Sequence, residues 1–468
     1  MSSKQKHRKH QTQKPPAHAK AGLAAPEESR ADYLAVLPGL LLCAMTLLIL
    51  LMDLALPGMA QEQYTNFPAL FRMTHAAIIA AGVLFWVIWL VRRKSSAQGL
   101  QGLREVMAPA HAGEAARIEL LPVLFFGLFL VWILLSTAVN GLDEKALHGV
   151  SYRNLGIFHF LSLILIYLFV SSQVKRASLR QGLLAAFLLV SDLAALAALA
   201  DHSILAIPAF AQKKELSAIF FNGNHYGYFL TMAVLVGAGL FLCRQGRRME
   251  LFGLISMLLN FAVLLLNHSL GCLLAAGISM GCLLVLMLLT NRAAARRLGI
   301  LLGCFAGLLL LGLLALAPLR SEFADLALSF HQVLSGDDAG SAGHNRWMLW
   351  GITCDLISQR PVFGYGCEGI SDILMSETGR ANPHNEVLTY AAFFGIPGAA
   401  FYVLGLVSVF AAWLRCKIWR DPFVLTAALA ALGYFLSSLF GVPMFYTAPF
   451  FFVFLGLSLG RLESPDPS

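Results

Sequence analysis

The feature that most constrains this chain is a series of apolar runs, each about as long as a membrane is thick. A helix needs roughly 20 apolar residues to cross about 30 Å of hydrocarbon, and about 12 runs reach that length. They lie near residues 33–56, 74–91, 118–138, 155–172, 181–200, 225–243, 249–267, 270–290, 298–317, 385–413, 422–440 and 445–460. The runs are too long and alternate too little for barrel strands. The sequence therefore predicts an all-α polytopic membrane protein.

The positions of lysine and arginine predict its orientation, because positively charged loops stay in the cytoplasm. With the N-terminus placed inside, 25 of the 34 Lys and Arg residues fall in the inner loops and the two tails. This distribution favours an even number of spans and cytoplasmic N- and C-termini. The net charge of +8 is then mainly a topology signal, and nucleic acid is not an expected partner.

Nothing in the sequence divides the chain into soluble modules. Residues 1–32 have no apolar periodicity and predict a disordered basic cytoplasmic tail. Residues 33–460 predict a single transmembrane domain in contact with membrane lipid, and residues 461–468 a cytoplasmic C-terminal tail.

The longest polar interruption, about 318–383, predicts a large extracytoplasmic loop. Within it Trp347, Trp350, Cys354 and Ile357 recur at helical spacing, which predicts an amphipathic helix over about 344–360 at the membrane interface. Pro361 should end that helix. The glycines of residues 363–366 then allow a tight turn close to neighbouring backbone.

The end of this loop is typical of a helix start. Asn382 could cap the next helix and Pro383 could occupy its first position, which would put His384 in the first turn. There the helix dipole would keep the imidazole neutral, as a general base requires. The glycines and proline of residues 395–398 predict a kink about three turns deeper.

Several motifs occur in order on the predicted outer side. They are Gly149-x-x-x-Arg153-x-x-Gly156, the run from Phe220 to Leu230 with Asn222, Asn224 and His225, then Arg346-x-x-x-Trp350, Pro361-x-x-Gly364-x-Gly366, His384-Asn385-x-x-Leu388 and Gly395-x-x-Gly398. Together they resemble the bacterial O-antigen ligase and O-antigen polymerase superfamily, over about residues 149 to 400.

This resemblance implies a glycosyltransferase of the bacterial cytoplasmic (inner) membrane that works in cell-envelope polysaccharide biosynthesis. It would move a glycan from an undecaprenyl-diphosphate carrier to a hydroxyl of a glycan, lipid or protein acceptor, on the extracytoplasmic face. His384 would be the general base and Arg346, with Arg153, would bind the diphosphate. Asn222, Asn224, His225 and Asn385 would contact substrate, and neither a cofactor nor a metal ion would be required.

One position departs from the family pattern. Members commonly carry a basic Ser-Arg-Gly motif where this chain has Ser269-Leu270-Gly271, so Leu270 replaces an arginine. Either His268 or Arg153 could take its place.

Simpler interpretations remain open for each candidate. His384 could only hydrogen-bond a loop, Arg346 could only reach toward lipid headgroups, and the Asn222–His225 segment could only cap a helix. A transporter or flippase for lipid-linked glycans is the main alternative function, and an assembly factor without activity is another. A transporter should place ionisable groups at mid-membrane depth, whereas here the candidate residues gather at one face.

Overall fold

The computed structural model describes residues 28–55, 72–74, 76–80, 114–150, 153–174, 176–203, 216–220, 222–243, 246–290, 295–336 and 339–459. Every regular element in this part of the chain is helical. The helices are α1 (Glu28–Ala55), α4 (Glu114–Asn140), α5 (Glu144–His148), α6 (Ile157–Gln173), α7 (Ala177–Ser203), α8 (Gly223–Leu242), α9 (Arg247–Asn267), α10 (Leu270–Thr290), α11 (Ala295–Ala315), α12 (Ala317–Ser335), α13 (Ala342–Gln359), α14 (Ser371–Thr378), α15 (Glu386–Arg415), α16 (Pro422–Ser438) and α17 (Ala448–Leu457).

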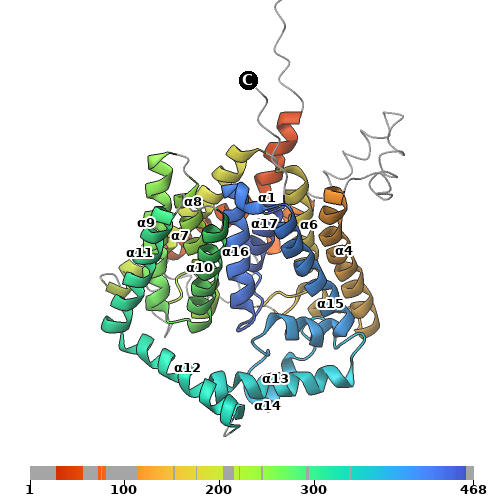
Figure 1. Ribbon diagram of the computed structural model, residues 1–468. Coiled ribbons are helices and arrows are strands. Elements are labelled where there is room, and N and C mark those ends of the chain that lie inside the picture. Colours follow the sequence, from red (N-terminus) through yellow and green to blue (C-terminus); the bar gives the residue numbers. More distant parts are fainter. Residues whose placement is uncertain are drawn as a thin grey trace, which may run out of the picture.

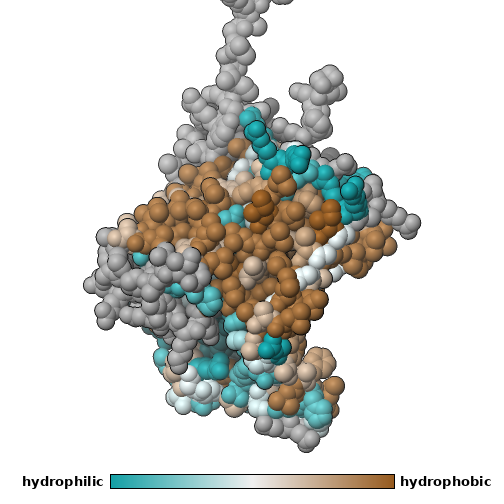
Figure 2. Space-filling view, turned by 90° about the vertical axis from the view of Figure 1, so that its left-hand side faces the viewer, coloured by the Kyte–Doolittle hydropathy of each residue, from teal (hydrophilic) through white to brown (hydrophobic). Residues whose placement is uncertain are grey.

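The predicted membrane architecture is confirmed. Eight helices are long and apolar enough to cross a bilayer among the described residues, and α6, α16 and α17 are shorter apolar helices. Each of these helices matches one of the predicted runs. The predicted run near 74–91 lies mostly outside the described residues. The two predicted tails also lie outside them, except for residues 28–32, which belong to α1. Figure 2 shows a broad hydrophobic band across this face of the molecule with hydrophilic side chains above and below it, as expected for a polytopic membrane protein.

Helix α8 forms the centre of the bundle. It packs against α9, α10 and α16, and nearly all its side chains are buried. A β-carbon added to Gly237 of α8 would lie 2.7 Å from the carbonyl oxygen of Gly253 in α9, so the two helices approach as closely as backbones allow. Small residues at such crossings are typical of membrane helices.

Helices α12, α13 and α14 form a layer across the lower end of the bundle in Figure 1. The predicted interfacial helix corresponds to α13, which has regular helical geometry from Arg346 and ends before Pro361. The sequence did not predict α12, a 19-residue helix that follows α11 almost directly, with a proline in its first turn. The predicted outer loop is therefore mainly helical.

The turn that follows α13 is bonded to a break in α15. Gly395 has φ of 73° and ψ of 174°, which interrupts the helix and confirms the predicted kink. The backbone N–H groups of Tyr365 and Gly366 donate to the carbonyl oxygens of Ala392 and Phe393, at 3.0 and 2.8 Å. The N–H of Ile396 donates back to the carbonyl oxygen of Pro361 at 2.8 Å. The layer is thus fixed to α15 through backbone groups that the break leaves free.

We expect Gly395→Ala to destabilise the protein by about 3 kcal/mol, because its backbone conformation is almost exclusive to glycine. The new β-carbon would also lie 2.0 Å from the carbonyl oxygen of Val362. The melting temperature of the purified protein in detergent measures the effect. Gly299→Ala in α11, where a β-carbon meets nothing within 4 Å, is the matched control. Equal melting temperatures for the two variants would contradict this account of the turn.

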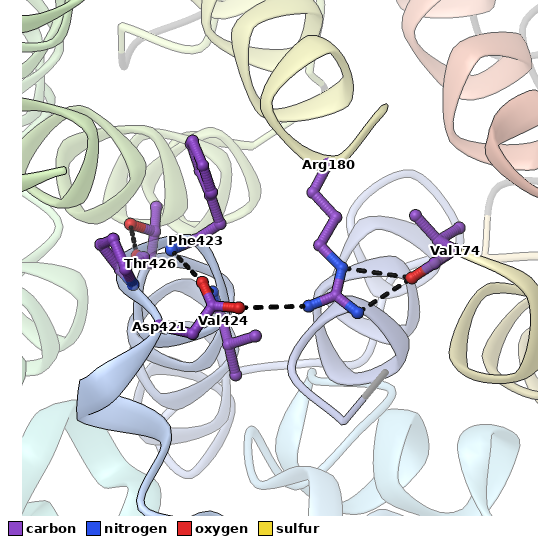
Figure 3. A network of polar contacts seen from close by, with 7 residues as sticks. Val174, Arg180, Asp421, Phe423, Val424 and Thr426 are labelled. Atoms are coloured by element: carbon purple, nitrogen blue, oxygen red, sulfur yellow. Dashed lines mark hydrogen bonds and ion pairs between the residues drawn. The ribbon is translucent and has the colours of Figure 1, made fainter. Parts of the chain in front are cut away.

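A buried arginine ties the helices together at the opposite end of the bundle, where α15 ends and α16 begins. Figure 3 shows Arg180 of α7 pointing between Val174 and Asp421. Its Nε and one terminal nitrogen donate to the carbonyl oxygen of Val174 at 3.2 and 2.9 Å, and the other terminal nitrogen lies 3.9 Å from the Asp421 carboxylate. Asp421 in turn accepts from the N–H groups of Phe423 and Val424, which caps α16.

Candidate active site

A cavity of about 940 Å³ lies between the α12–α13 layer and the ends of α7 to α10. Its polar walls come from elements far apart in sequence. They include Asp201, His202, Asn224, Asn267, His268, Ser269, Glu322, Asp325, Ser329, His344, Arg346, Arg380 and His384, with Trp347, Trp350 and Phe440 as aromatic lining. The volume is in the range of pockets that bind small-molecule ligands.

His384 lies in the segment between α14 and α15 and lines this cavity. The prediction that Asn382 caps α15 was wrong by three residues. Helix α15 begins at Glu386, and the side chain of Asn385 caps it by accepting from the N–H of Leu388 at 3.0 Å. Asn382 instead accepts from the N–H of His384 at 3.2 Å, and His384 adopts φ of 53°. The histidine therefore precedes the helix, in a turn of its own.

Arg346 and Trp350 of α13 face the same cavity, because residues four apart share one side of a helix. One terminal nitrogen of Arg346 donates to the carbonyl oxygen of Gly343 at 3.2 Å. The indole N–H of Trp350 donates to the carbonyl oxygen of Pro383 at 3.0 Å, directly before His384. Arg346 thus brings a cation into the cavity, and Trp350 holds the turn that carries His384.

The electrostatic environment keeps His384 neutral. Burial, and then the positive charges of Arg346 and Arg380, lower the pKa of His384 to about 4. Burial also lowers the pKa of Arg346, although a guanidinium remains charged at neutral pH. A neutral imidazole can accept a proton, so the arrangement suits a general base. The cause is burial and nearby cations, since His384 is not in the first turn of α15.

Residues 233–403 match the family model described as O-antigen ligase. This match supports membership of the O-antigen ligase and polymerase superfamily. No curated protein matches the chain significantly. The matched region extends from α8 to α15 and contains both Arg346 and His384. Membership supports glycan transfer as the activity of this multi-pass membrane protein, with a lipid-linked glycan as donor.

The three asparagines that the sequence predicts as substrate contacts differ in their positions relative to the cavity. Asn224 lines the cavity, and its side-chain oxygen accepts from the Ser269 hydroxyl at 2.8 Å. Asn222 caps α8 by accepting from the N–H of Asn224 at 2.7 Å. Asn385 caps α15. Asn222 and Asn385 thus have a structural role in the positions of their helices.

His225 lies near His384, close enough for their charges to interact. Its Nδ1 is buried and has no hydrogen-bond partner among the described residues, and the same holds for Nδ1 of His384. His384 lines the cavity, and His225 of α8 lies close to it but outside the cavity lining.

Arg153 lies outside the cavity lining. Its Nε and one terminal nitrogen contact the Glu368 carboxylate, each at 2.9 Å, and both side chains are buried. Glu368 also accepts from the N–H of Leu155 at 3.2 Å. Of the two residues that could replace the arginine missing at Leu270, only His268 lines the cavity, as does Leu270 itself.

Sequence reasoning missed the surroundings of Glu386, the first residue of α15. Its carboxylate is fully buried and accepts from the hydroxyls of Tyr402 at 2.5 Å and Tyr434 at 3.3 Å. These hydrogen bonds fix the start of α15, two residues after His384. Tyrosines inside apolar runs were the available signal, but spacing does not show which acid they meet.

No three His, Cys, Asp or Glu side chains group to hold a metal ion in the part of the chain that the structure describes. Metal independence stays a prediction.

Proposed function

We propose that this protein transfers a glycan from undecaprenyl diphosphate to an acceptor hydroxyl on the extracytoplasmic face of the bacterial cytoplasmic membrane. The main support is one observation: a neutral histidine and a partly buried arginine, His384 and Arg346, line the same large cavity beside the membrane-spanning bundle. Family membership supports the reaction class.

The proposed reaction needs one base and one cationic site. The acceptor oxygen attacks the anomeric carbon of the donor sugar, and its proton passes to a ring nitrogen of His384. The bond between the anomeric carbon and the phosphate oxygen breaks, and the electron pair leaves with the diphosphate. Arg346 stabilises the negative charge that develops on this leaving group, because its planar fork binds phosphate oxygens in pairs. The protonated histidine then loses its proton to solvent.

The remaining candidates support these two groups. Asn224 lines the cavity and His225 lies close enough to His384 for their charges to interact, and we assign both to the bound sugar or acceptor. Asn222 and Asn385 act through helix caps, as positioning residues. Arg153 and Glu368 fix the segment before α6 to the layer, and a direct contact of Arg153 with diphosphate would require their ion pair to open.

A reconstituted assay tests the proposal. Purified protein in vesicles with undecaprenyl-diphosphate-linked glycan and a glycan or lipid acceptor should release undecaprenyl diphosphate in step with the transferred product, measured by chromatography and mass spectrometry. Release of undecaprenyl monophosphate would place the cleavage at another bond and contradict the mechanism. Movement of intact donor between leaflets without cleavage would favour the flippase.

Two exposed native cysteines test the orientation. Cys354 lies on α13 in the layer and Cys416 directly after α15, at the other end of that helix. In variants that retain one of them, a membrane-impermeant maleimide added outside intact spheroplasts should label Cys354, and Cys416 only after lysis. Labelling of Cys416 from outside would place the cavity on the cytoplasmic side.

A further inference from the structure

Arg380 is a cation of the cavity that the family motifs do not include. It follows Gly379, which ends α14 with φ of 70°. Its N–H donates to the Thr378 hydroxyl at 3.2 Å and its carbonyl oxygen accepts from the same hydroxyl at 3.3 Å. These bonds fix the backbone of Arg380 at the cavity wall, four residues before His384.

The charge of Arg380 is not balanced within the described residues. Its guanidinium makes no hydrogen bond or ion pair there, whereas Arg153 pairs with Glu368 and Arg297 with Glu250. Arg380 is also close enough to Arg346 and His384 for its charge to act unfavourably on both. Two repelling cations at one cavity are the arrangement that a multiply charged anion would stabilise.

Arg346 also has unused hydrogen-bonding capacity. Its Nε is buried and has no acceptor within the described structure. Three carboxylates, of Asp201, Glu322 and Asp325, line the same cavity, but none of them forms an ion pair with either arginine among the described residues. Glu322 acts favourably on Arg346, and its carboxylate lies 3.6 Å from Nε2 of His344. A buried donor without an acceptor points to a ligand that supplies one.

Helix α10 contributes no cation to the wall of the cavity. Leu270, the first residue of α10, lines the cavity with an apolar side chain where the family pattern has arginine. Both Leu270 and Arg380 border the same cavity, so an arginine from the segment between α14 and α15 can supply the charge that α10 lacks.

We propose that Arg380 is the second guanidinium of the leaving-group site, binding one phosphate of the donor diphosphate while Arg346 binds the other. This inference rests on the proposed function. It assigns diphosphate binding to α13 and the α14–α15 segment, and it makes Arg380 the replacement for the arginine absent at Leu270.

Binding of farnesyl diphosphate and farnesyl monophosphate to the detergent-solubilised protein tests this assignment without catalysis. Arg380→Ala should weaken binding of the diphosphate about tenfold or more, as expected for loss of one charge-assisted contact, and change monophosphate binding much less. The double variant Arg380→Ala with Leu270→Arg should recover most of the diphosphate affinity. Arg320→Ala, an exposed arginine of α12 outside the cavity lining, is the control.

The pH profile gives an independent readout. Arg346 and Arg380 both lower the pKa of His384, and His225 lies close enough for its charge to interact with that ring. The other titratable groups that line the cavity are Asp201, His202, His268, Glu322, Asp325 and His344. Removing the charge of Arg380 should raise the pKa of His384, which moves the acid limb of the transfer rate to higher pH. A residue that only shaped the fold would not move that limb in this direction.

Each outcome decides between the proposals. Unchanged diphosphate affinity in Arg380→Ala, with loss of affinity in Arg346→Ala, would overturn the role of Arg380 and leave the proposed function intact. Equal losses for diphosphate and monophosphate would overturn the two-phosphate assignment. Full transfer by both arginine variants would instead refute the proposed function. If Arg380→Ala does not fold, the same binding comparison is made with Arg380→Gln, which removes the charge but keeps a longer side chain than alanine.

Discussion

Replacing His384 by alanine should reduce glycan transfer by about 10²- to 10⁴-fold, the contribution typical of a general base. The protein should still fold, because the His384 ring neither caps a helix nor makes a side-chain hydrogen bond to the described residues: Asn385 caps α15 and Trp350 holds the carbonyl of Pro383. The loss should appear in kcat, since a base acts on the transition state more than on donor binding. Transfer rates with purified protein and size-exclusion profiles measure the two effects.

His331→Ala is the matched control, because His331 is exposed on α12 and outside the cavity lining. It should transfer glycan at the wild-type rate. In the wild type, transfer should remain insensitive to pH down to about the pKa of His384, near 4, and fall below it as the ring becomes charged. Normal transfer by His384→Ala would refute the assignment of the base.

Replacing Arg346 by alanine should reduce transfer by about 10²- to 10³-fold, comparable to the loss of one donor to a developing anion. The side chain is partly buried and its Nε is fully buried, so solvent screens its charge less than at the surface and the charge can interact strongly with a phosphate in the cavity. Arg346→Lys should recover only part of the rate, because an ammonium keeps the charge but cannot bind two phosphate oxygens in parallel. Steady-state kinetics with varied donor concentration measure both.

Arg320→Ala provides the comparison here also, since Arg320 donates only to the carbonyl oxygens of Leu313 and Leu314 among the described residues. Its kinetics should match the wild type. If Arg346→Lys is as active as the wild type, bidentate binding is not required and Arg346 acts as a point charge. If Arg346→Ala retains full activity, another cation must stabilise the leaving group.

The features of the fold that follow from local sequence patterns were predictable. Span positions follow from the length of apolar runs, and α13 followed from the spacing of Trp347 and Trp350. The kink at Gly395 followed from its local composition. The start of α15 was misplaced because Asn382 and Asn385 are both plausible caps, and only the backbone of His384 decides between them.

The site was predictable only where it followed motifs. Arg346 and His384 lie at the same cavity, as their motifs indicated. The position of Arg380 at that cavity, and the hydrogen bonds from Tyr402 and Tyr434 to Glu386, depend on contacts between segments that are distant in the sequence. The same is true of the Arg153 ion pair, whose partner lies 215 positions away in the chain. No local pattern encodes such pairings, so they become visible only when the helices are packed.

The positive φ of His384 has a consequence for selection. A left-handed backbone costs a residue with a β-carbon about 1–2 kcal/mol, and asparagine or glycine tolerates it better. His384→Gly or His384→Asn could therefore give a protein with a higher melting temperature that transfers no glycan. If His384 is the base that we propose, selection for thermal stability alone would favour its replacement, whereas selection for glycan transfer would retain it.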